Sequence, residues 1–307
     1  MSTTLGFIGL GVMGERMCRN LARKSGHKVI ALDTRQAPLD ALAADGVVAA
    51  SGVADVAARC DVIFLSLPGE KEVAAVCLGA GGLLANGRKG QVVVDMSTNS
   101  VSAARDLAQR FAQAGIAFAD APVARTREAA EAGTLAIMVG AEPALMERIR
   151  PLLGTMGTAI SHCGGVGAGQ IVKIINNMLA FNQVLAISQA FVMGTRAGVE
   201  PRLLLETLSM GSSDSFALRN HAMKAILPHE FPTPSFSAHY VLKDLSYAFK
   251  LASEVNTPLD FGHLAARYYQ GAVDAGIGEE YYPAVVKLIE KNWTPGKPAL
   301  QALGGNT

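Results

Sequence analysis

Gly9-Leu10-Gly11-Val12-Met13-Gly14 decides how the rest of this 307-residue chain is interpreted. The segment has the pattern Gly-x-Gly-x-x-Gly and follows an apolar run that begins at Leu5, so it is expected where a strand turns into a helix. At such a turn, backbone N–H groups and the helix N-terminus can bind a pyrophosphate. Asp33, 19 residues after Gly14, ends the next apolar run, where a carboxylate can accept hydrogen bonds from both ribose hydroxyls. Together these two signals predict a dinucleotide-binding site.

Asp33 also favours NAD over NADP as the cofactor. A carboxylate about 4 Å from a 2′-phosphate meets a repulsion of roughly 4 kcal/mol at intermediate dielectric. Arg35, two residues later, could bind that phosphate, so NADP stays an alternative. Arg35 is otherwise interpreted as a solvated loop arginine.

The pattern of apolar runs divides the chain near residue 163. The first half alternates short apolar runs with helical stretches, which is typical of βαβ units. Unbroken runs such as Val62–Leu65 are expected in parallel strands that helices cover on both faces. The runs predict strands at residues 5–10, 28–32, 62–67, 91–96, 117–119 and 136–139. The second half predicts only helices: a long one opening at residues 164–167, one starting at 200–201, and others at 238–254 and 259–276. We therefore predict an α/β domain at residues 1–163 and an all-α domain at residues 164–307, joined by the long helix.

Composition and charge exclude several classes of protein. The chain is 50% hydrophobic and 17% charged with a formal net charge of +1, so it is not mainly disordered. The low charge and the 6% aromatic content do not fit nucleic-acid binding. The first ten residues lack the basic stretch of an export signal. The four cysteines form no Cys-x-x-Cys pair, and the six histidines lack metal-ligand spacing, which predicts reduced thiols, no metal site and a cytoplasmic location.

The uncharged stretch from Ile174 to Thr195 is long enough to suggest a membrane span. Its polar side chains are costly in hydrocarbon but suit a buried helix that offers them partners. They are Asn176, Asn177, Asn182, Gln183, Ser188 and Gln189. We predict a central helix of a protein that does not enter the membrane.

Several motifs, in order and over nearly the whole chain, resemble the β-hydroxyacid dehydrogenase family, which includes 3-hydroxyisobutyrate dehydrogenase and tartronate semialdehyde reductase. The motifs stand here as residues 6–14, Asp95-Met96-Ser97-Thr98, Asp120-Ala121-Pro122-Val123, residues 167–177 and Lys243-Asp244-Leu245. The resemblance implies a Rossmann-like first domain and a helical second domain that shapes the substrate pocket and the contacts of a homodimer or homotetramer. It also implies NAD(P)-dependent oxidation of a hydroxyl beta to a carboxylate.

The resemblance further implies roles for particular residues. Lys173 would be the general acid/base and Asn177 would hold the substrate. The cofactor would be bordered by Thr98 and the Leu67-Pro68 loop, with Lys243 at its nicotinamide end. Without the resemblance, Lys243 would be interpreted as an exposed lysine paired with Asp244.

The physical setting of Lys173 supports its role independently. The spacing i, i+4 places Lys173 and Asn177 on one face of the long helix. A lysine among Val172, Ile174 and Ile175 is expected to be desolvated, which lowers its pKa toward a value useful for proton transfer. A surface charge is the competing interpretation.

One loop departs from the family pattern. Relatives usually continue Asp-Ala-Pro-Val with Ser-Gly-Gly, which holds the substrate carboxylate, but this chain has Ala124-Arg125-Thr126. The serine hydroxyl is absent, and two positions that let the backbone approach closely carry side chains. The guanidinium of Arg125 could bind an anionic group of the substrate, or it could face solvent beside Arg127.

These observations predict an NAD-dependent dehydrogenase or reductase that interconverts a small anionic β-hydroxy acid and its aldehyde or keto form. Two alternatives stay open: a non-catalytic dinucleotide-binding scaffold on the same fold, because function does not follow from fold, and an imine reductase. Imine reductases of this fold commonly lack the lysine, so Lys173 discriminates against them. The sequence identifies neither the hydroxy acid nor the physiological direction.

Overall fold

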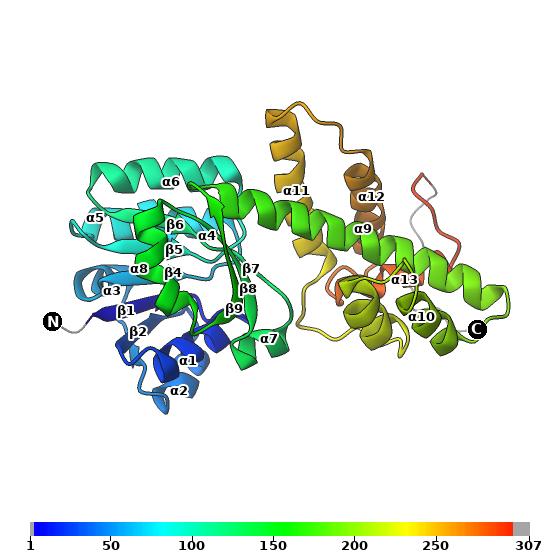
Figure 1. The fold of residues 1–307 in the computed structure, drawn as a ribbon, viewed down its shortest axis with the longest axis horizontal. Coiled ribbons are helices and arrows are strands. Elements are labelled where there is room, and N and C mark those ends of the chain that lie inside the picture. Colours follow the sequence, from blue (N-terminus) through cyan, green and yellow to red (C-terminus); the bar gives the residue numbers. More distant parts are fainter. Residues whose placement is uncertain (1–2, 297–307) are drawn as a thin grey trace. The chain divides into compact units, whose positions relative to one another are not determined.

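The computed structural model describes residues 3–296. Its chain divides into two compact units, Met1–Lys173 and Ile174–Thr307. The division falls inside one helix, α9 (Ala168–Arg196), which begins in the first unit and continues into the second (Figure 1).

The N-terminal unit is built on one sheet of mostly parallel strands, which confirms the α/β prediction. Neighbouring strands follow the order β3-β2-β1-β4-β5-β6-β8-β7, and β9 pairs with β8. Strands β1 to β6 pair in parallel, so the loops after β1, β2, β4 and β5 emerge at the same edge. The strands are β1 (Thr4–Ile8), β2 (Lys28–Leu32), β3 (Val48–Ala49), β4 (Val62–Leu65), β5 (Val92–Asp95), β6 (Ala117–Asp120), β7 (Val123–Ala124), β8 (Leu135–Gly140) and β9 (Gly157–Gly164).

Both faces of the sheet are buried under helices, which explains why its central strands are apolar without interruption. Along β4, Phe64 packs in one core cluster, while Ile63 and Leu65 pack in another, as expected when successive side chains point to opposite faces. The covering helices are α1 (Gly14–Lys24), α2 (Gln36–Ala43), α3 (Val53–Arg59), α4 (Glu70–Leu78), α5 (Leu83–Asn86), α6 (Val101–Gln113), α7 (Arg127–Ala132) and α8 (Pro143–Leu153) (Figure 1).

The far edge of the sheet differs from the simple parallel pattern. β8 runs antiparallel to β6 and to β7, and β9 runs parallel to β8. Strands β3 and β7 have two residues each, too few to produce a periodic signal. β9 mixes exposed and half-buried positions and contains Ser161 and His162, so its sequence has no apolar run to find.

The C-terminal unit is helical, as predicted. Its elements after α9 are α10 (Pro201–Ser209), the π-helix η1 (Leu218–Ile226), α11 (Ala238–Glu254), α12 (Asp260–Asp274), the 3₁₀ helix η2 (Tyr282–Val285) and α13 (Val286–Glu290). The helix predicted to start at residues 200–201 is α10, whose first N–H groups donate to the carboxylate of Glu200. Aromatic rings contribute to the core of this unit: Phe181 packs edge-on against Tyr269 and Tyr282.

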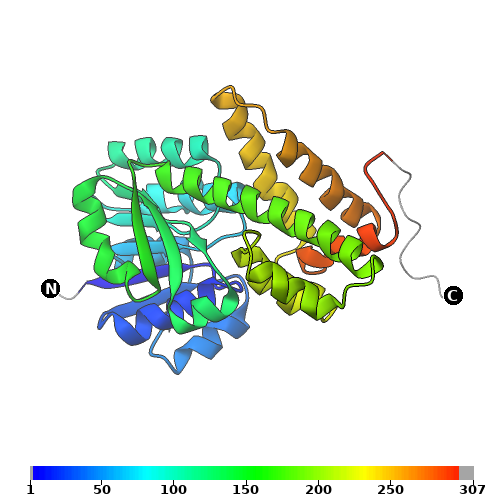
Figure 2. The same cartoon turned by 45° about the vertical axis from the view of Figure 1, so that its right-hand side comes forward.

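Helix α9 is long and apolar enough to cross a membrane by length and composition alone, but the central helix of a folded core passes the same test. Val184 and Leu185 pack in the core of the C-terminal unit, where α9 runs alongside the other helices (Figure 2). Ser188 Oγ donates to the Val184 carbonyl at 2.7 Å, and Gln189 Nε2 donates to the Tyr268 hydroxyl at 3.2 Å. These two polar side chains have protein partners, as the side chains of a core helix require.

Candidate functional site

The glycine loop that joins β1 to α1 contains two glycines that packing requires and one that leaves space. Gly9 has φ +95°, and a Cβ there would lie 2.3 Å from the Ser66 carbonyl oxygen. A Cβ on Gly14 would lie 2.1 Å from the Gly9 carbonyl oxygen, whereas a Cβ on Gly11 would meet nothing within 4 Å. No side chain caps the start of α1. The loop therefore fits a dinucleotide, because bare backbone at Gly11 and uncapped helix amides lie where a pyrophosphate needs them.

Asp33, directly after β2, is brought against this loop. Its Oδ2 accepts the Leu10 N–H at 2.6 Å, and its Oδ1 accepts the Arg35 N–H at 2.9 Å and Arg35 Nε at 3.1 Å. Burial alone would raise the pKa of Asp33, but the backbone N–H groups of Arg35 and Leu10 and the Arg35 guanidinium hold it below its ordinary value. Arg35 Nη2 also donates to the Leu10 carbonyl at 2.9 Å, so this guanidinium is occupied by Asp33 and the loop.

The other residues expected at the cofactor follow the neighbouring strands. Leu67 and Pro68 come after β4, and Thr98 comes after β5. The Leu67 N–H donates to Ser97 Oγ at 2.9 Å, which ties the two loops together. Leu67 and Thr98 are half-buried and Pro68 is exposed. The structure thus gathers these residues with the glycine loop at the carboxyl edge of the sheet, where open α/β sheets bind ligands.

Loop 124–126 retains a backbone conformation suited to glycine. Arg125 has φ +89°, in the left-handed region that is unfavourable for a residue with a Cβ. Its side chain is exposed, and Nη1 donates to the Thr134 carbonyl at 2.6 Å. Ala124 pairs with Ala136 of β8, and the Thr126 hydroxyl caps α7 by accepting the Ala129 N–H. Thr126 therefore already has a local structural role.

Lys173 and Asn177 occupy successive turns of α9, and both are largely buried, at 9% and 7% exposure. In the C-terminal unit, Asn177 Nδ2 donates to Asp244 Oδ2 at 2.6 Å. Asp244 Oδ1 lies 3.1 Å from Lys243 Nζ, and Lys243 Nζ also lies 5.7 Å and 5.4 Å from the ring centroids of Tyr240 and Tyr247. The pairing of Lys243 with Asp244 that the sequence left open is present, but Asp244 is buried.

Two buried carboxylates belong to the motifs that resemble the family, but the sequence indicated no role for either. Asp95 and Asp120 end β5 and β6 and are fully buried. Burial raises the pKa of each to about 6, although hydrogen bonds act in the opposite direction. Asp95 accepts the Ser97 N–H and Asn99 Nδ2. Their one signal in the sequence was an acid at the end of an apolar strand.

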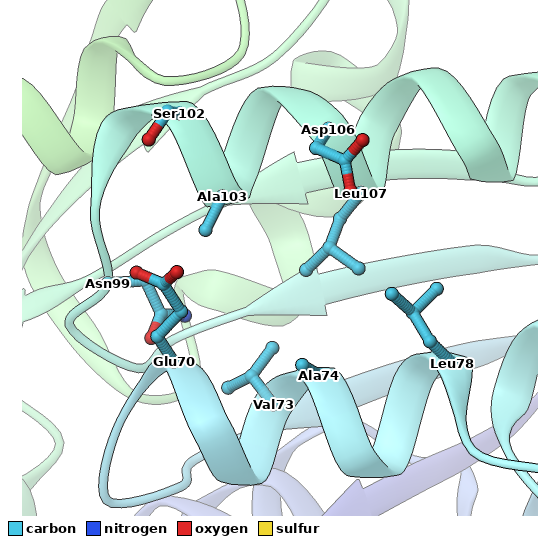
Figure 3. A pocket seen from close by; sticks show the side chains of 9 residues that line it. All are labelled: Glu70, Val73, Ala74, Leu78, Asn99, Ser102, Ala103, Asp106 and Leu107. Carbon is cyan, nitrogen blue, oxygen red and sulfur yellow. The ribbon is translucent and has the colours of Figure 1, made fainter.

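A separate hollow of about 310 Å³ lies between α4 and α6 in the N-terminal unit (Figure 3). Its lining is apolar along the two helices, with Glu70, Asn99 and Ser102 at one end and Asp106 further along α6. None of the predicted site residues lines it. Within residues 3–296, no group of three or more His, Cys, Asp or Glu side chains could hold a metal ion, and the cysteines are free thiols.

Comparison with protein families matches almost the whole chain. Residues 4–165 match the NAD binding domain of 6-phosphogluconate dehydrogenase. Residues 167–289 match a model described as the NAD-binding domain of NADP-dependent 3-hydroxyisobutyrate dehydrogenase.

Individual proteins and solved structures are also similar to this chain over most of its length. The 2-(hydroxymethyl)glutarate dehydrogenase of Eubacterium barkeri is 39% identical over 94% of this chain and 96% of its own length. The structure of 3-hydroxyisobutyrate dehydrogenase from Mycobacterium tuberculosis with L-serine is similar with a TM-score of 0.84, 30% identity, and coverage of 94% of this chain and 99% of that one. An imine reductase from Myxococcus stipitatus has a TM-score of 0.63 at 19% identity over 93% of this chain and 99% of its own, a likeness that shows the fold alone.

Proposed function

Since the chain belongs to the β-hydroxyacid dehydrogenase family, and is an NAD-binding dehydrogenase, we propose that it interconverts a small β-hydroxy acid carrying a second anionic group and the corresponding aldehyde or ketone. The observation that carries the catalytic part is the enclosure of Lys173, at 9% exposure, one helical turn before Asn177. A lysine that is nearly removed from water is suited to exchanging a proton with a substrate hydroxyl.

The residues at the carboxyl edge of the sheet fit NAD. Gly11 leaves the space that a pyrophosphate needs, and Asp33 would accept hydrogen bonds from ribose hydroxyls. NAD, when bound, supplies the acceptor for a hydride from the substrate carbon. Because the guanidinium of Arg35 is engaged by Asp33 and the Leu10 carbonyl, we propose NAD as the preferred cofactor over NADP.

In this proposal the protein supplies proton transfer and orientation. Lys173 Nζ takes the hydroxyl proton during oxidation and returns it during reduction. Asn177 holds the substrate, and its amide is oriented by the hydrogen bond from Nδ2 to Asp244. Asp244 in turn is held by Lys243 at 3.1 Å, which we place at the nicotinamide end of the cofactor.

The substrate class is argued from Arg125. A residue other than glycine at φ +89° costs about 1 to 2 kcal/mol, and such strain is commonly kept at binding sites. The Thr134 carbonyl accepts one N–H of the guanidinium at 2.6 Å and fixes its direction, and a guanidinium can bind a carboxylate through two parallel hydrogen bonds. The curated relative at 39% identity is named for 2-(hydroxymethyl)glutarate, a dicarboxylate, which supports a second anion in the substrate of this chain.

A panel assay tests the proposal. The full-length protein is given NAD with 3-hydroxyisobutyrate, L-serine and 2-(hydroxymethyl)glutarate, and formation of NADH is followed by absorbance. We expect turnover, fastest with the dicarboxylate. Binding of NADH without turnover of any acid would favour the scaffold alternative, and reduction of cyclic imines in preference to aldehydes would favour the imine reductase alternative.

A further inference from the structure

We propose that Asp120 is the residue that positions Lys173, by capping the N-terminus of α9 from the neighbouring strand β6. The inference rests on the proposed function in taking Lys173 as the proton-transferring group. It goes beyond that function by assigning a role to a buried acid that does not itself contact the reacting atoms.

The geometry of the cap is complete within the N-terminal unit. Asp120 Oδ1 accepts the Gly167 N–H at 2.7 Å, and Oδ2 accepts the Gln170 N–H at 2.8 Å. The first amide belongs to the residue just before α9 and the second to the first turn of the helix, where N–H groups have no partner within the helix. A side chain at the residue before a helix usually satisfies them, but here that residue is Gly167. Asp120 of β6 therefore provides the cap that the residue before α9 cannot provide.

The surrounding backbone reserves the space for this carboxylate. Gly140, the partner of Asp120 between β6 and β8, would place a Cβ 2.4 Å from Asp120 Oδ1. Gly169, in the first turn of α9, would place one 2.8 Å from Oδ2. Any side chain at either position would push the carboxylate away from the amides that it caps.

A second contact fixes the same turn to the loop after β5. The Gln170 side chain accepts the Asn99 N–H at 3.0 Å through Oε1 and donates to the Ser97 carbonyl at 2.8 Å through Nε2. Those residues flank Thr98, which we place at the cofactor. Lys173 follows Gln170 by three residues, roughly 4.5 Å of helical rise. The start of α9, and with it the Cα of Lys173, is thus set relative to the loop that borders the cofactor.

Stability alone does not account for this arrangement. Removing a carboxylate from water is expensive, and a buried charge is weak evidence for stabilisation. Burial raises the pKa of Asp120 to about 6 despite hydrogen bonds from Gly167 and Gln170, which indicates an incompletely compensated cost. A cap that serves only to stabilise a helix is provided more cheaply by Ser or Asp at the residue before it. We therefore attribute the costly burial of the Asp120 carboxylate to a requirement for fixing the position of the start of α9.

The test uses Asp120→Asn in the full-length protein. Asparagine keeps the size of the side chain, but its NH₂ group cannot accept a hydrogen bond. One of the two backbone N–H groups would therefore lose its acceptor. We expect kcat with the preferred hydroxy acid to fall about 10-fold or more, because small misplacements of a reacting group are costly. We expect the limb of the pH profile that disappears in Lys173→Ala to move, and the Kd for NADH to change less than about 2-fold.

Asp45→Asn is the matched control. Asp45 is a largely buried carboxylate of the same unit that pairs with Arg19 and Arg23 and lies on no predicted site element. It should lower the melting temperature and leave kcat and the pH profile unchanged.

The outcomes separate the inference from the proposed function. Wild-type kcat and pH profile in Asp120→Asn, with turnover lost in Lys173→Ala, would overturn the inference and leave the proposed function standing. Wild-type turnover in Lys173→Ala would remove the proposed function itself. If Asp120→Asn does not fold, Gly140→Ala displaces the same carboxylate while keeping its charge, and unchanged kcat in that variant would overturn the inference. Equal losses of NADH affinity and kcat would also overturn it, as a merely structural effect.

Discussion

The two units of this chain contain ionisable groups whose pKa values burial shifts in opposite directions. The N-terminal unit buries the acids Asp95 and Asp120, whose pKa values burial raises to about 6. The C-terminal unit encloses His221, whose pKa burial, with a smaller effect of Lys224, lowers to about 4. His221 Nδ1 lies 2.6 Å from the Tyr281 hydroxyl, and its ring packs against aromatic neighbours.

The partners of these groups show what each unit uses them for. The buried acids bind backbone N–H groups of the loops and helix start that carry predicted site residues. The partly enclosed histidine packs among aromatic side chains. We therefore expect changes in the first unit to affect turnover and cofactor choice, and a change at His221 to affect stability and its dependence on pH.

The largest effect is expected at Lys173. Lys173→Ala should lower kcat by about 100-fold or more, because a positioned acid/base contributes on that scale. Binding of NADH should persist when it is followed by fluorescence titration. Lys224→Ala, which removes an exposed lysine bonded to Asn220, is the matched control and should retain full activity. Comparable turnover in the two variants would contradict the expectation that changes in the first unit affect turnover.

Arg125 should show the next largest effect. The Arg125 side chain is exposed, so its pairing with a substrate carboxylate would be desolvated by the bound substrate. Loss of one partner from such a pair costs about 2 to 5 kcal/mol, so Arg125→Ala should lower kcat/KM for a dicarboxylate hydroxy acid by roughly 30-fold or more, with little change in KM for NAD. Arg125→Gly should lose the same activity yet melt at a higher temperature than Arg125→Ala, because glycine accepts φ +89° without strain. If both variants match the wild type on every acid, the exposed arginine makes no contact with the substrate and the loop acts by its shape.

Replacing Asp33 should change the preference for NAD over NADP, by a smaller factor than the effect expected at Arg125. Asp33→Ala removes the repulsion of a 2′-phosphate and the acceptor for ribose hydroxyls, so the ratio of kcat/KM for NAD to that for NADP should narrow by about 10-fold. Asp40→Ala, on the exposed face of α2, serves as the control. Equal or better use of NADP by the wild type would point to Arg35 as a phosphate ligand.

The smallest effect is expected on stability. The pKa of His221 is lower in the folded state, at about 4 against an ordinary 6.5, so its contribution is present above pH 6.5 and is lost as the pH falls toward 4. The wild type should lose on the order of 1 kcal/mol more than His221→Phe between pH 7 and pH 5, since the ring is only partly enclosed. Denaturant titrations at the two pH values measure this difference. An identical loss in both proteins would show that His221 does not titrate differently on folding.

The sequence predicted the parts of this molecule that depend on local pattern. Apolar runs identified the central parallel strands, and glycine spacing with Asp33 indicated the loop that we propose binds the cofactor, because each signal is encoded within a few neighbouring residues. The helices α10 and α11 were also predicted, from Glu200-Pro201 and from the helical stretch at residues 238–254. β9, with its exposed and polar positions, gave no such signal.

Contacts between distant segments were not accessible from pattern. Asp120 and Gln170 are 50 residues apart and meet at 2.8 Å, and Asn177 and Asp244 are 67 residues apart. Each pair consists of residues that are ordinary in their own segments. The family pattern described above has glycine at this position, which accepts the left-handed backbone found at Arg125. The hydrogen bond of Arg125 to Thr134 had no signal in the sequence.

One measurement tests the proposed function most directly: the ratio of kcat/KM for 2-(hydroxymethyl)glutarate to that for 3-hydroxyisobutyrate, with NAD and the wild-type protein at neutral pH. The two acids share a hydroxymethyl group beside a carboxylate and differ in the second carboxylate that Arg125 would bind. We predict turnover of both, with a preference of about 10-fold or more for the dicarboxylate. A ratio near one or below it, or the absence of NADH formation with either acid, would contradict the proposal.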